Sequence, residues 1–163
     1  MLVTGGLGFI GSAFAKRAAS AGNRVVVLDL MTYAADPTSL AGRSDIEILR
    51  GNITDTSLVA ELLQRHEIDT VVNFAAESHV DRSIADPESF MQTNILGVYS
   101  MLNASLARFQ KLITDDAKRF RFVQISTDEV FGSLGKTGSF TEESPYDPRS
   151  PYSASKAARN FYV

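Results

Sequence analysis

The chain has 163 residues, of which 44% are hydrophobic, and its 16 basic and 19 acidic side chains give a formal net charge of −3. This composition indicates one soluble globular domain. The basic residues are scattered, so we expect neither a nucleic-acid nor a membrane partner, and no stretch approaches the roughly 20 apolar residues of a membrane span. Without cysteine, the sequence excludes disulfides and thiolate sites. We therefore expect a cytoplasmic protein with no bound metal.

Short apolar runs alternate along the chain with longer stretches of helical periodicity, which is typical of a parallel sheet built from βαβ units. The runs are mostly β-branched or aromatic and continuous, which indicates strands buried on both faces. Five strands are expected, at residues 2–4, 24–29, 46–49, 70–75 and 121–127. The predicted fold class is α/β, a doubly wound parallel sheet of Rossmann type with flanking helices.

Two helices are clearest in the sequence. Asp55 is the predicted N-cap of a helix over about residues 56–66, and Asp86 is the predicted N-cap of a longer helix with Pro87 in its first turn. The longer helix carries apolar residues at intervals of three or four, and this face should pack on the sheet. The residues of this face are Met91, Ile95, Val98, Leu102 and Leu106.

The chain ends at Val163, soon after the start of a further expected helix. A doubly wound sheet would be unfinished there, with an exposed edge strand. We therefore expect a domain that is truncated at its C-terminal side and belongs to a longer protein.

A glycine-rich turn follows the first expected strand. Gly5, Gly8 and Gly11 are three residues apart and lead into a helix. In dinucleotide-binding folds the first glycine permits a tight turn, the second lets the backbone approach a pyrophosphate, and the third lets the helix pack closely, while N–H groups at the helix N-terminus bind the anion. The motif alone is weak evidence, and an ordinary glycine turn is the alternative.

Asp29 supports the dinucleotide interpretation, because it ends the second expected strand about 20 residues further on. A carboxylate there can accept hydrogen bonds from both hydroxyls of an adenosine ribose and would repel a 2′-phosphate, so NAD is favoured over NADP. Asn52 could hydrogen-bond an adenine amino group, or it could be an ordinary turn residue. The small Ala75 and Ala76 either leave room for a ligand or serve close packing. A turn cap is the alternative for Asp29.

Tyr152 and Lys156 are four residues apart, so they share one face of a helix. A nearby ammonium favours the phenolate, which would let the tyrosine take a proton from an alcohol. A solvated helix face is the alternative. It is less favoured here because the same sequence also has a glycine turn and an aspartate that are typical of NAD sites.

Thr127 ends the fifth expected strand and is followed by Asp128 and Glu129, at the edge of the sheet where ligands bind. Two carboxyl groups in different environments can divide into a proton donor and a proton acceptor, as a dehydration requires. A turn cap is the alternative.

Four segments together make the chain resemble the dTDP-glucose 4,6-dehydratases, a family of extended short-chain dehydrogenases that modify nucleotide sugars. The segments are residues 5–11, 74–84, 126–132 and 151–156. The glycine turn and the Tyr/Lys pair are shared with epimerases, whereas the Thr-Asp-Glu triplet discriminates; GDP-mannose dehydratases look like Thr-Ser-Glu at these positions. The resemblance covers the whole chain.

The resemblance implies a reaction. Tyr152 deprotonates the C4 hydroxyl of glucose as hydride passes to NAD, Lys156 tunes the tyrosine, and Thr127 hydrogen-bonds the sugar. Glu129 then removes the C5 hydrogen, Asp128 protonates the departing C6 hydroxyl, and the hydride returns to C6. The product is dTDP-4-keto-6-deoxyglucose.

The resemblance also implies a cofactor site, a homodimer and an absent C-terminal substrate domain, so residues 1–163 would be an incomplete NAD-binding domain that is inactive alone. Ser78 is expected near both cofactor and substrate. Two departures from the family are Phe131 in place of tyrosine and Asn52 in place of aspartate. The residues expected to line the cofactor are Gly5, Gly8, Phe9, Ile10, Gly11, Asp29, Leu30, Met31, Thr32, Asn52, Ile53, Phe74, Ala75, Ala76, Glu77, Ser78, Thr93, Tyr152 and Lys156.

Other functions share these motifs. A UDP-glucose 4,6-dehydratase could carry every motif present, because residues that select the base would lie beyond Val163. Another nucleotide-sugar epimerase or dehydratase is a further alternative. A non-catalytic NAD-binding module is the alternative from another class, although such a module has no reason to keep the Tyr/Lys pair and the two acids together.

Overall fold

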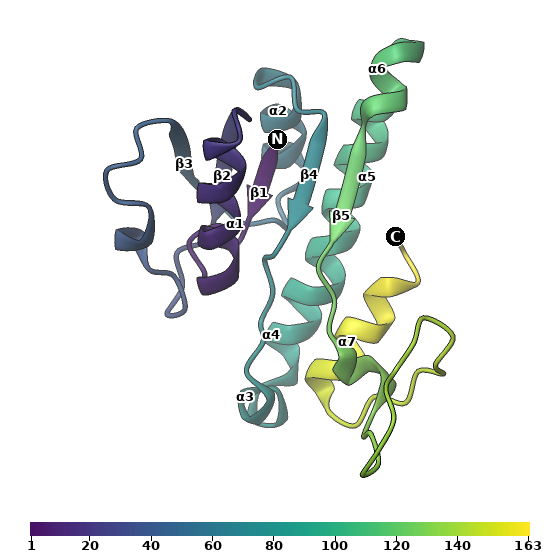
Figure 1. Ribbon diagram of the computed structural model, residues 1–163. Helices are drawn as coiled ribbons and strands as arrows, with labels where there is room; N and C mark the ends of the chain where they lie inside the picture. The colour runs from purple at the N-terminus through teal and green to yellow at the C-terminus, as the bar shows by residue number, and fades with distance from the viewer.

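The computed structural model describes residues 1–163, with every side chain except that of Thr114. Its centre is a five-stranded parallel sheet in the order β3-β2-β1-β4-β5, with helices on both faces (Figure 1). The strands are β1 (Leu2–Thr4), β2 (Val25–Asp29), β3 (Ile46–Arg50), β4 (Thr70–Asn73) and β5 (Arg121–Gln124). The helices are α1 (Phe9–Ser20), α2 (Thr56–Arg65), α3 (Val80–Ala85), α4 (Pro87–Met91), α5 (Val98–Phe109), α6 (Thr114–Arg119) and α7 (Pro151–Asn160). The predicted fold class and the five predicted strands are confirmed.

Two apolar layers enclose the sheet, because successive side chains of a strand point to opposite faces. Leu2, Val26 and Val71 pack with α2 and α5, whereas Val3 and Val27 pack with α1. Figure 1 shows the same arrangement, with α1 on one face of the sheet and α2 and α5 on the other. This two-sided burial explains the continuous apolar runs of β1, β2 and β4. The edge strands β3 and β5 are only partly buried, which corrects the expectation for them.

Strands β4 and β5 are shorter than predicted. They end at Asn73 and Gln124 instead of Ala75 and Thr127. The buried Asn73 side chain explains this difference, because its Oδ1 accepts the N–H of Ala75 at 3.1 Å and its Nδ2 donates to Gln124 at 2.8 Å. The chain therefore leaves the sheet directly after the Asn73–Gln124 pair, and the residues that follow form loops above its carboxyl edge.

The long predicted helix is interrupted. Its Asp86 cap and Pro87 start are confirmed, but a π-helical segment, Gln92–Gly97, separates α4 from α5. The predicted apolar face is only partly right: Val98 is buried, whereas Met91 is 57% and Leu106 54% exposed. Most buried positions lie one residue before the predicted ones, both ahead of the π-helical segment and after it. The residues that are buried are Phe90, Asn94, Gly97, Val98, Met101, Ala104 and Ser105.

Small residues let this helix approach its neighbours closely. A Cβ on Gly97 would lie 2.6 Å from Ile53 Cδ1, which is closer than real contacts allow. The helix over Thr56–Arg65 has the expected cap, since Asp55 Oδ1 accepts the N–H of Leu58 at 3.0 Å. Among the described helices, none is both long enough and apolar enough to cross a bilayer.

Candidate active site

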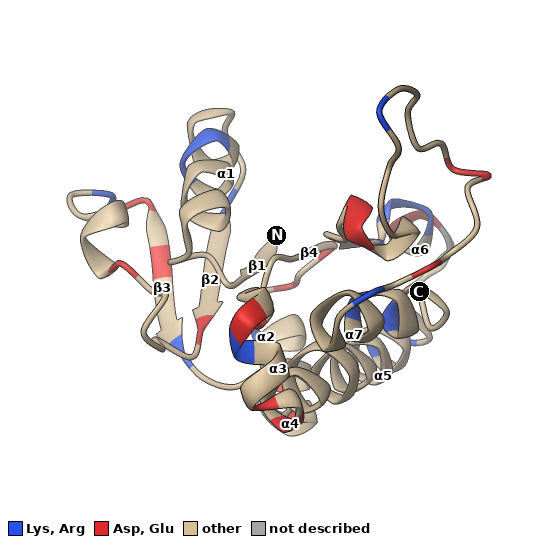
Figure 2. Cartoon of the chain, turned by 90° about the horizontal axis from the view of Figure 1, so that it is seen from below, with Lys and Arg blue, Asp and Glu red and all other residues tan. Residues whose placement is uncertain are grey.

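A pocket of about 420 Å³ lies at the carboxyl edge of the sheet, the edge toward which the strands point at the bottom of Figure 1. The chain connects β1 to β2 on one side and then crosses to β4 on the other, so the pocket occupies the topological switch point between β1 and β4, where doubly wound sheets bind ligands. Figure 2 looks onto this edge, with α1, β2 and β3 on one side and α3, α5 and α7 on the other.

The pocket brings together nearly all the residues that were predicted to line a cofactor. Met31 is the one that does not line it. Six residues that the sequence did not indicate also line the pocket: Leu28, Ala34, Ala35, Gly51, Ile125 and Ser126. Leu28, Gly51 and Ser126 are immediate neighbours of predicted site residues and extend the same walls of the pocket.

The glycine turn has the geometry that its spacing predicted. Gly5 has a positive φ of 66°, and a Cβ on it would lie 2.6 Å from the backbone nitrogen of Ala75. A Cβ on Gly11 would overlap the carbonyl oxygen of Gly5. Gly8 is the N-cap of α1 without a side chain to cap it, and the first turn of α1 holds no acidic residue. The N–H groups of that turn are therefore available to an anion in the pocket.

Asp29 is fixed by the backbone on two sides. Its Oδ2 accepts the N–H of Leu7 at 2.9 Å, and its Oδ1 accepts the N–H of Met31 at 2.8 Å. Each carboxylate oxygen has further acceptor capacity, so both remain able to bind a hydroxyl. The turn gives Met31 a positive φ of 58°, and its side chain packs against the core beside α1, which explains why it is absent from the pocket.

Asn52 is a turn residue that also lines the pocket. Its Oδ1 accepts the N–H of Thr54 at 3.0 Å in a local turn, and its contact with an adenine stays a prediction. The small residues Ala75 and Ala76 also line the pocket, and Ala75 additionally packs on the core.

The tyrosine and lysine lie on α7, which begins with a capping box between Ser150 and Ser153. Tyr152 and Lys156 are 8% and 5% exposed, and the Lys156 Nζ lies 5.9 Å from the centre of the Tyr152 ring. The ammonium also donates to the carbonyl oxygen of Ile125 at 3.0 Å. The shared helix face is therefore buried against the end of β5, and a solvated face is ruled out.

The Thr-Asp-Glu segment starts a 3-10 turn, Asp128–Phe131, with Thr127 as its N-cap. The Thr127 hydroxyl accepts the N–H of Glu129 at 3.3 Å and donates to Asp128 at 3.4 Å. Thr127 and Asp128 line a second pocket that shares Ser126 with the first. Glu129 lines neither of these two pockets, although its charge acts on Tyr152.

The charges around Tyr152 and Lys156 shift the pKa of the tyrosine differently from the expectation. Burial raises the pKa of Tyr152, the charges of Glu129 and Asp128 add to the rise, and a hydrogen bond with Thr127 and the charge of Arg159 oppose it. Burial, together with the charge of Arg159, lowers the pKa of Lys156 to about 7. The protein alone thus favours neutral tyrosine, and the cation that favours the phenolate is Arg159 instead of Lys156.

Sequence reasoning missed Arg159, which is completely buried. Its Nη2 donates to the carbonyl oxygen of Ile125, the same acceptor that binds Lys156, and burial lowers its pKa to about 10. Its Nε and Nη1 have no hydrogen-bond partner among the described residues. A spacing of seven residues from Tyr152 and three from Lys156 places it on their helix face, and this signal could have revealed it.

Sequence reasoning also missed Asn94, a fully buried residue of the π-helical segment. Its Oδ1 accepts the N–H of Glu77 at 3.0 Å, and its Nδ2 donates to the carbonyl of Glu77 at 2.9 Å and to the hydroxyl of Ser155 at 2.8 Å. The side chain therefore connects the wall of the pocket to the helix of Tyr152. A polar residue within an apolar helix face was the available signal.

The parallel sheet, the glycine turn at its switch point and the buried pair on α7 define a Rossmann-type domain. The chain belongs to the GDP-mannose 4,6 dehydratase family, whose model matches residues 2–163. The curated relatives that match it include a dTDP-glucose 4,6-dehydratase of Xanthomonas campestris pv. campestris (strain B100), which is 52% identical over 165 residues. That alignment covers 99% of this chain and 47% of the relative.

Solved structures are similar as well. A dTDP-glucose 4,6-dehydratase of Streptomyces venezuelae with NAD bound is 43% identical, with a TM-score of 0.84 over 98% of this chain and 49% of that one. A UDP-glucose 4-epimerase of Thermus thermophilus in complex with NAD is 28% identical, with a TM-score of 0.85 over 99% of this chain and 48% of that one. The chain spans about half the length of the curated relatives it matches.

Substitution of Gly5 tests the glycine turn. Gly5→Ala should lower the free energy of unfolding by about 2–4 kcal/mol, because it adds a backbone clash to the strain of a left-handed conformation. Gly22→Ala is the matched control, since Gly22 has a φ of 86° and no atom lies within 4 Å of the place that its Cβ would take. Urea denaturation measures both variants. Equal losses of stability would show that the close approach to Ala75 is unimportant.

The lowered pKa of Lys156 predicts that the free energy of unfolding depends on pH. Its pKa is about 7 in the folded protein against an ordinary value of 10.5, so the unfolded chain binds more protons between these pH values and stability rises with pH there. From pH 7 to pH 9, the wild type should gain about 2 kcal/mol relative to Lys156→Met. Below pH 9 the raised pKa of Tyr152 contributes little.

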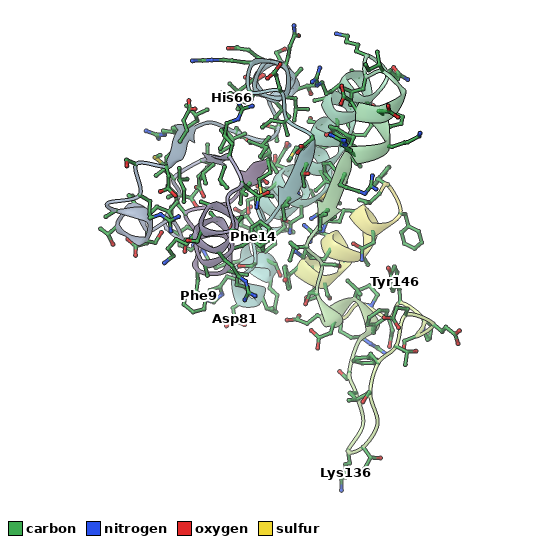
Figure 3. All side chains as sticks on the ribbon, turned by 45° about the horizontal axis from the view of Figure 1, so that its top comes forward. Phe9, Phe14, His66, Asp81, Lys136 and Tyr146 are labelled. Atoms are coloured by element: carbon green, nitrogen blue, oxygen red, sulfur yellow. The ribbon has the colours of Figure 1, made fainter. Side chains whose placement is uncertain are left out.

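Urea denaturation of nucleotide-free protein at the two pH values provides the measurement. Lys136→Met is the control, because Lys136 lies at the tip of an exposed loop that projects from the body of the molecule (Figure 3). Parallel pH profiles of the wild type and Lys156→Met would contradict the depressed pKa of this lysine.

Proposed function

We propose that this chain is the NAD-binding half of a dTDP-glucose 4,6-dehydratase. One observation carries the proposal: a buried Tyr152–Lys156 pair adjoins both a dinucleotide-sized pocket and a turn with two carboxyl groups, Asp128 and Glu129. The relatives support it, since the 52% identical protein is a dTDP-glucose 4,6-dehydratase. Because such relatives are about twice as long, we further propose a C-terminal substrate domain in the parent protein.

The residues of the pocket fit NAD. Gly5 and Gly11 keep the turn free of side chains, which leaves the first turn of α1 open to a pyrophosphate. Asp29 would accept the ribose hydroxyls and repel a 2′-phosphate, and Asn52 would face the adenine. When bound, NAD supplies a hydride acceptor for C4 of the sugar and a hydride donor for C6. Tyr152 and Lys156 line the same pocket at its other end.

The side chains of the chain divide the proton transfers. Tyr152 takes the proton of the C4 hydroxyl as C4 becomes a ketone, and the charge of Arg159 favours its phenolate. The ketone acidifies the C5 hydrogen, which Glu129 removes. Asp128 gives a proton to the C6 hydroxyl, which leaves as water, and Glu129 returns its proton to C5 when C6 is reduced. One water is lost, and the sugar undergoes no net oxidation.

Asp128 and Glu129 have environments that suit different roles. Asp128 accepts a hydrogen bond from Thr127 and lines the second pocket, whereas Glu129 lies where its charge acts on Tyr152. The two carboxyl groups therefore have different neighbours, which would let them act on different atoms of the sugar. The Thr127 hydroxyl contacts both Asp128 and Tyr152, and it would hydrogen-bond the sugar.

Substitutions in the full-length parent test this division, because we expect residues 1–163 alone not to turn over. The assay incubates enzyme, NAD and dTDP-glucose, quenches in alkali and reads the absorbance of 4-keto-6-deoxy sugars. Asp128→Asn and Glu129→Gln should each lower the rate by at least about 100-fold. In D₂O, Asp128→Asn should still exchange the C5 hydrogen, whereas Glu129→Gln should not.

Glu143→Gln is the control, since Glu143 is an exposed acid on the nearby loop. A parent rate in Asp128→Asn or Glu129→Gln would refute the role of that residue. UDP-glucose, run beside dTDP-glucose, tests the base: a signal with UDP-glucose alone would keep the mechanism and change the substrate. Silence with both sugars from a protein that binds NAD would favour an epimerase, to which the fold is equally similar, or a non-catalytic module.

We also propose that the parent is a cytoplasmic homodimer. Apolar side chains on α5 and at the end of α7 support a second subunit there: Tyr99, Leu106, Phe109, Phe161 and Tyr162 are each at least 43% exposed. Sedimentation equilibrium of the parent should give twice the mass of one chain, and Tyr99→Arg should shift the protein towards monomer, since a buried unpaired charge is costly. A wild type that sediments as a monomer would refute the dimer.

A further inference from the structure

Two rims of the NAD pocket are connected by side chains that the proposed chemistry does not use. Thr32 and Ala34 belong to one rim, in the loop after β2, and Glu77 and Ser78 belong to the other, in the loop after β4. Tyr33 lies between Thr32 and Ala34, and its hydroxyl donates to Glu77 Oε2 at 3.2 Å. The bond therefore joins segments that are 44 residues apart in sequence and lie on opposite sides of the pocket.

A second contact joins the same rims. The guanidinium carbon of Arg82, on α3, lies 3.9 Å from the centre of the Tyr33 ring, which is a cation–π distance. Helix α3 lies below the carboxyl edge of the sheet in Figure 1, and in Figure 3 its residue Asp81 is at the same outer edge of the molecule as Phe9 of α1. Tyr33 is thus held at its hydroxyl by one residue of the far rim and at its ring by another.

Both ends of this connection are anchored. The backbone of Glu77 is bound on its N–H and its carbonyl by the buried Asn94. Two hydrogen bonds anchor the loop of Tyr33. On its N-terminal side the Met31 N–H donates to Asp29, and on its C-terminal side the Asp36 N–H donates to the carbonyl of Leu7 at 2.9 Å. Because these hydrogen bonds hold both rims in place, a ligand that leaves the pocket past Tyr33 must first break the contacts that Tyr33 makes with Glu77 and Arg82.

We propose that Tyr33, Glu77 and Arg82 form a latch that slows the dissociation of NAD. The proposal rests on the proposed function, because that function puts NAD in the pocket. It also suits the reaction: the cofactor is returned to its starting state within each cycle, so slow release does not limit turnover. An exposed hydrogen bond alone contributes little, whereas two contacts on one ring from a fixed rim must break together.

Dissociation rates of NAD from the full-length parent test the latch. Protein loaded with a fluorescent etheno derivative of NAD is mixed with excess NAD, and the loss of signal gives the rate. Tyr33→Ala should dissociate at least about tenfold faster than the wild type. Tyr33→Phe keeps the ring over Arg82 and should be intermediate, and Arg82→Gln should also be faster than the wild type.

A double-substitution cycle isolates the hydrogen bond. The effects of Tyr33→Phe and Glu77→Ala on the dissociation rate should not be additive, because each substitution removes the same hydrogen bond. Circular dichroism checks that each variant folds, which the exposed position of Tyr33 favours, since its side chain is 59% exposed. Equal dissociation rates for the wild type and Tyr33→Ala would overturn the latch and leave the proposed function standing. A wild type that binds no NAD at all would overturn both.

Discussion

The amide side chain of Asn94 sets the geometry on which the rest of the site depends. It satisfies both backbone groups of Glu77 and also donates to Ser155, whose hydroxyl in turn donates to the carbonyl of Tyr152 at 2.7 Å. Buried polar groups must be paired, and here one side chain of the interrupted helix pairs groups from two other segments. The wall of the pocket, the interrupted helix and the helix of Tyr152 are consequently placed relative to one another by a single residue.

The π-helical segment contains the residue that makes this connection. The buried residues of the interrupted helix, from Phe90 through Asn94 and Gly97 to Met101, recur at intervals of three or four. Asn94 is the polar member of this buried face, and it lies within the π-helical segment Gln92–Gly97. Such segments occur often at functional sites. Here the segment carries a polar contact at the centre of the site.

Much of the fold and of the site followed from local rules. The alternation of strands and helices, the spacing of Gly5 to Gly11 and the four-residue interval of Tyr152 and Lys156 all depend on short-range geometry, and the structure has them where the sequence predicted. The charge of Arg159 on Tyr152, the inward turn of Met31 and the early ends of β4 and β5 depend instead on burial and on partners distant in sequence. Spacing indicates that Arg159 shares a helix face with Tyr152, but spacing and periodicity carry no information about its burial, about the turn of Met31 or about the ends of the strands.

Asp29 shows what such long-range contacts achieve before any ligand arrives. The N–H groups of Leu7 and Met31 hold its carboxylate in one orientation, within a turn in which Met31 has a left-handed backbone. The loss of rotational freedom that a flexible carboxylate would suffer on binding a ribose has therefore already occurred when the chain folds. Part of the affinity for the nucleotide at this edge of the sheet is therefore obtained at the expense of the stability of the domain. A substitution that relaxes the turn at Met31 would stabilise the fold and weaken nucleotide binding.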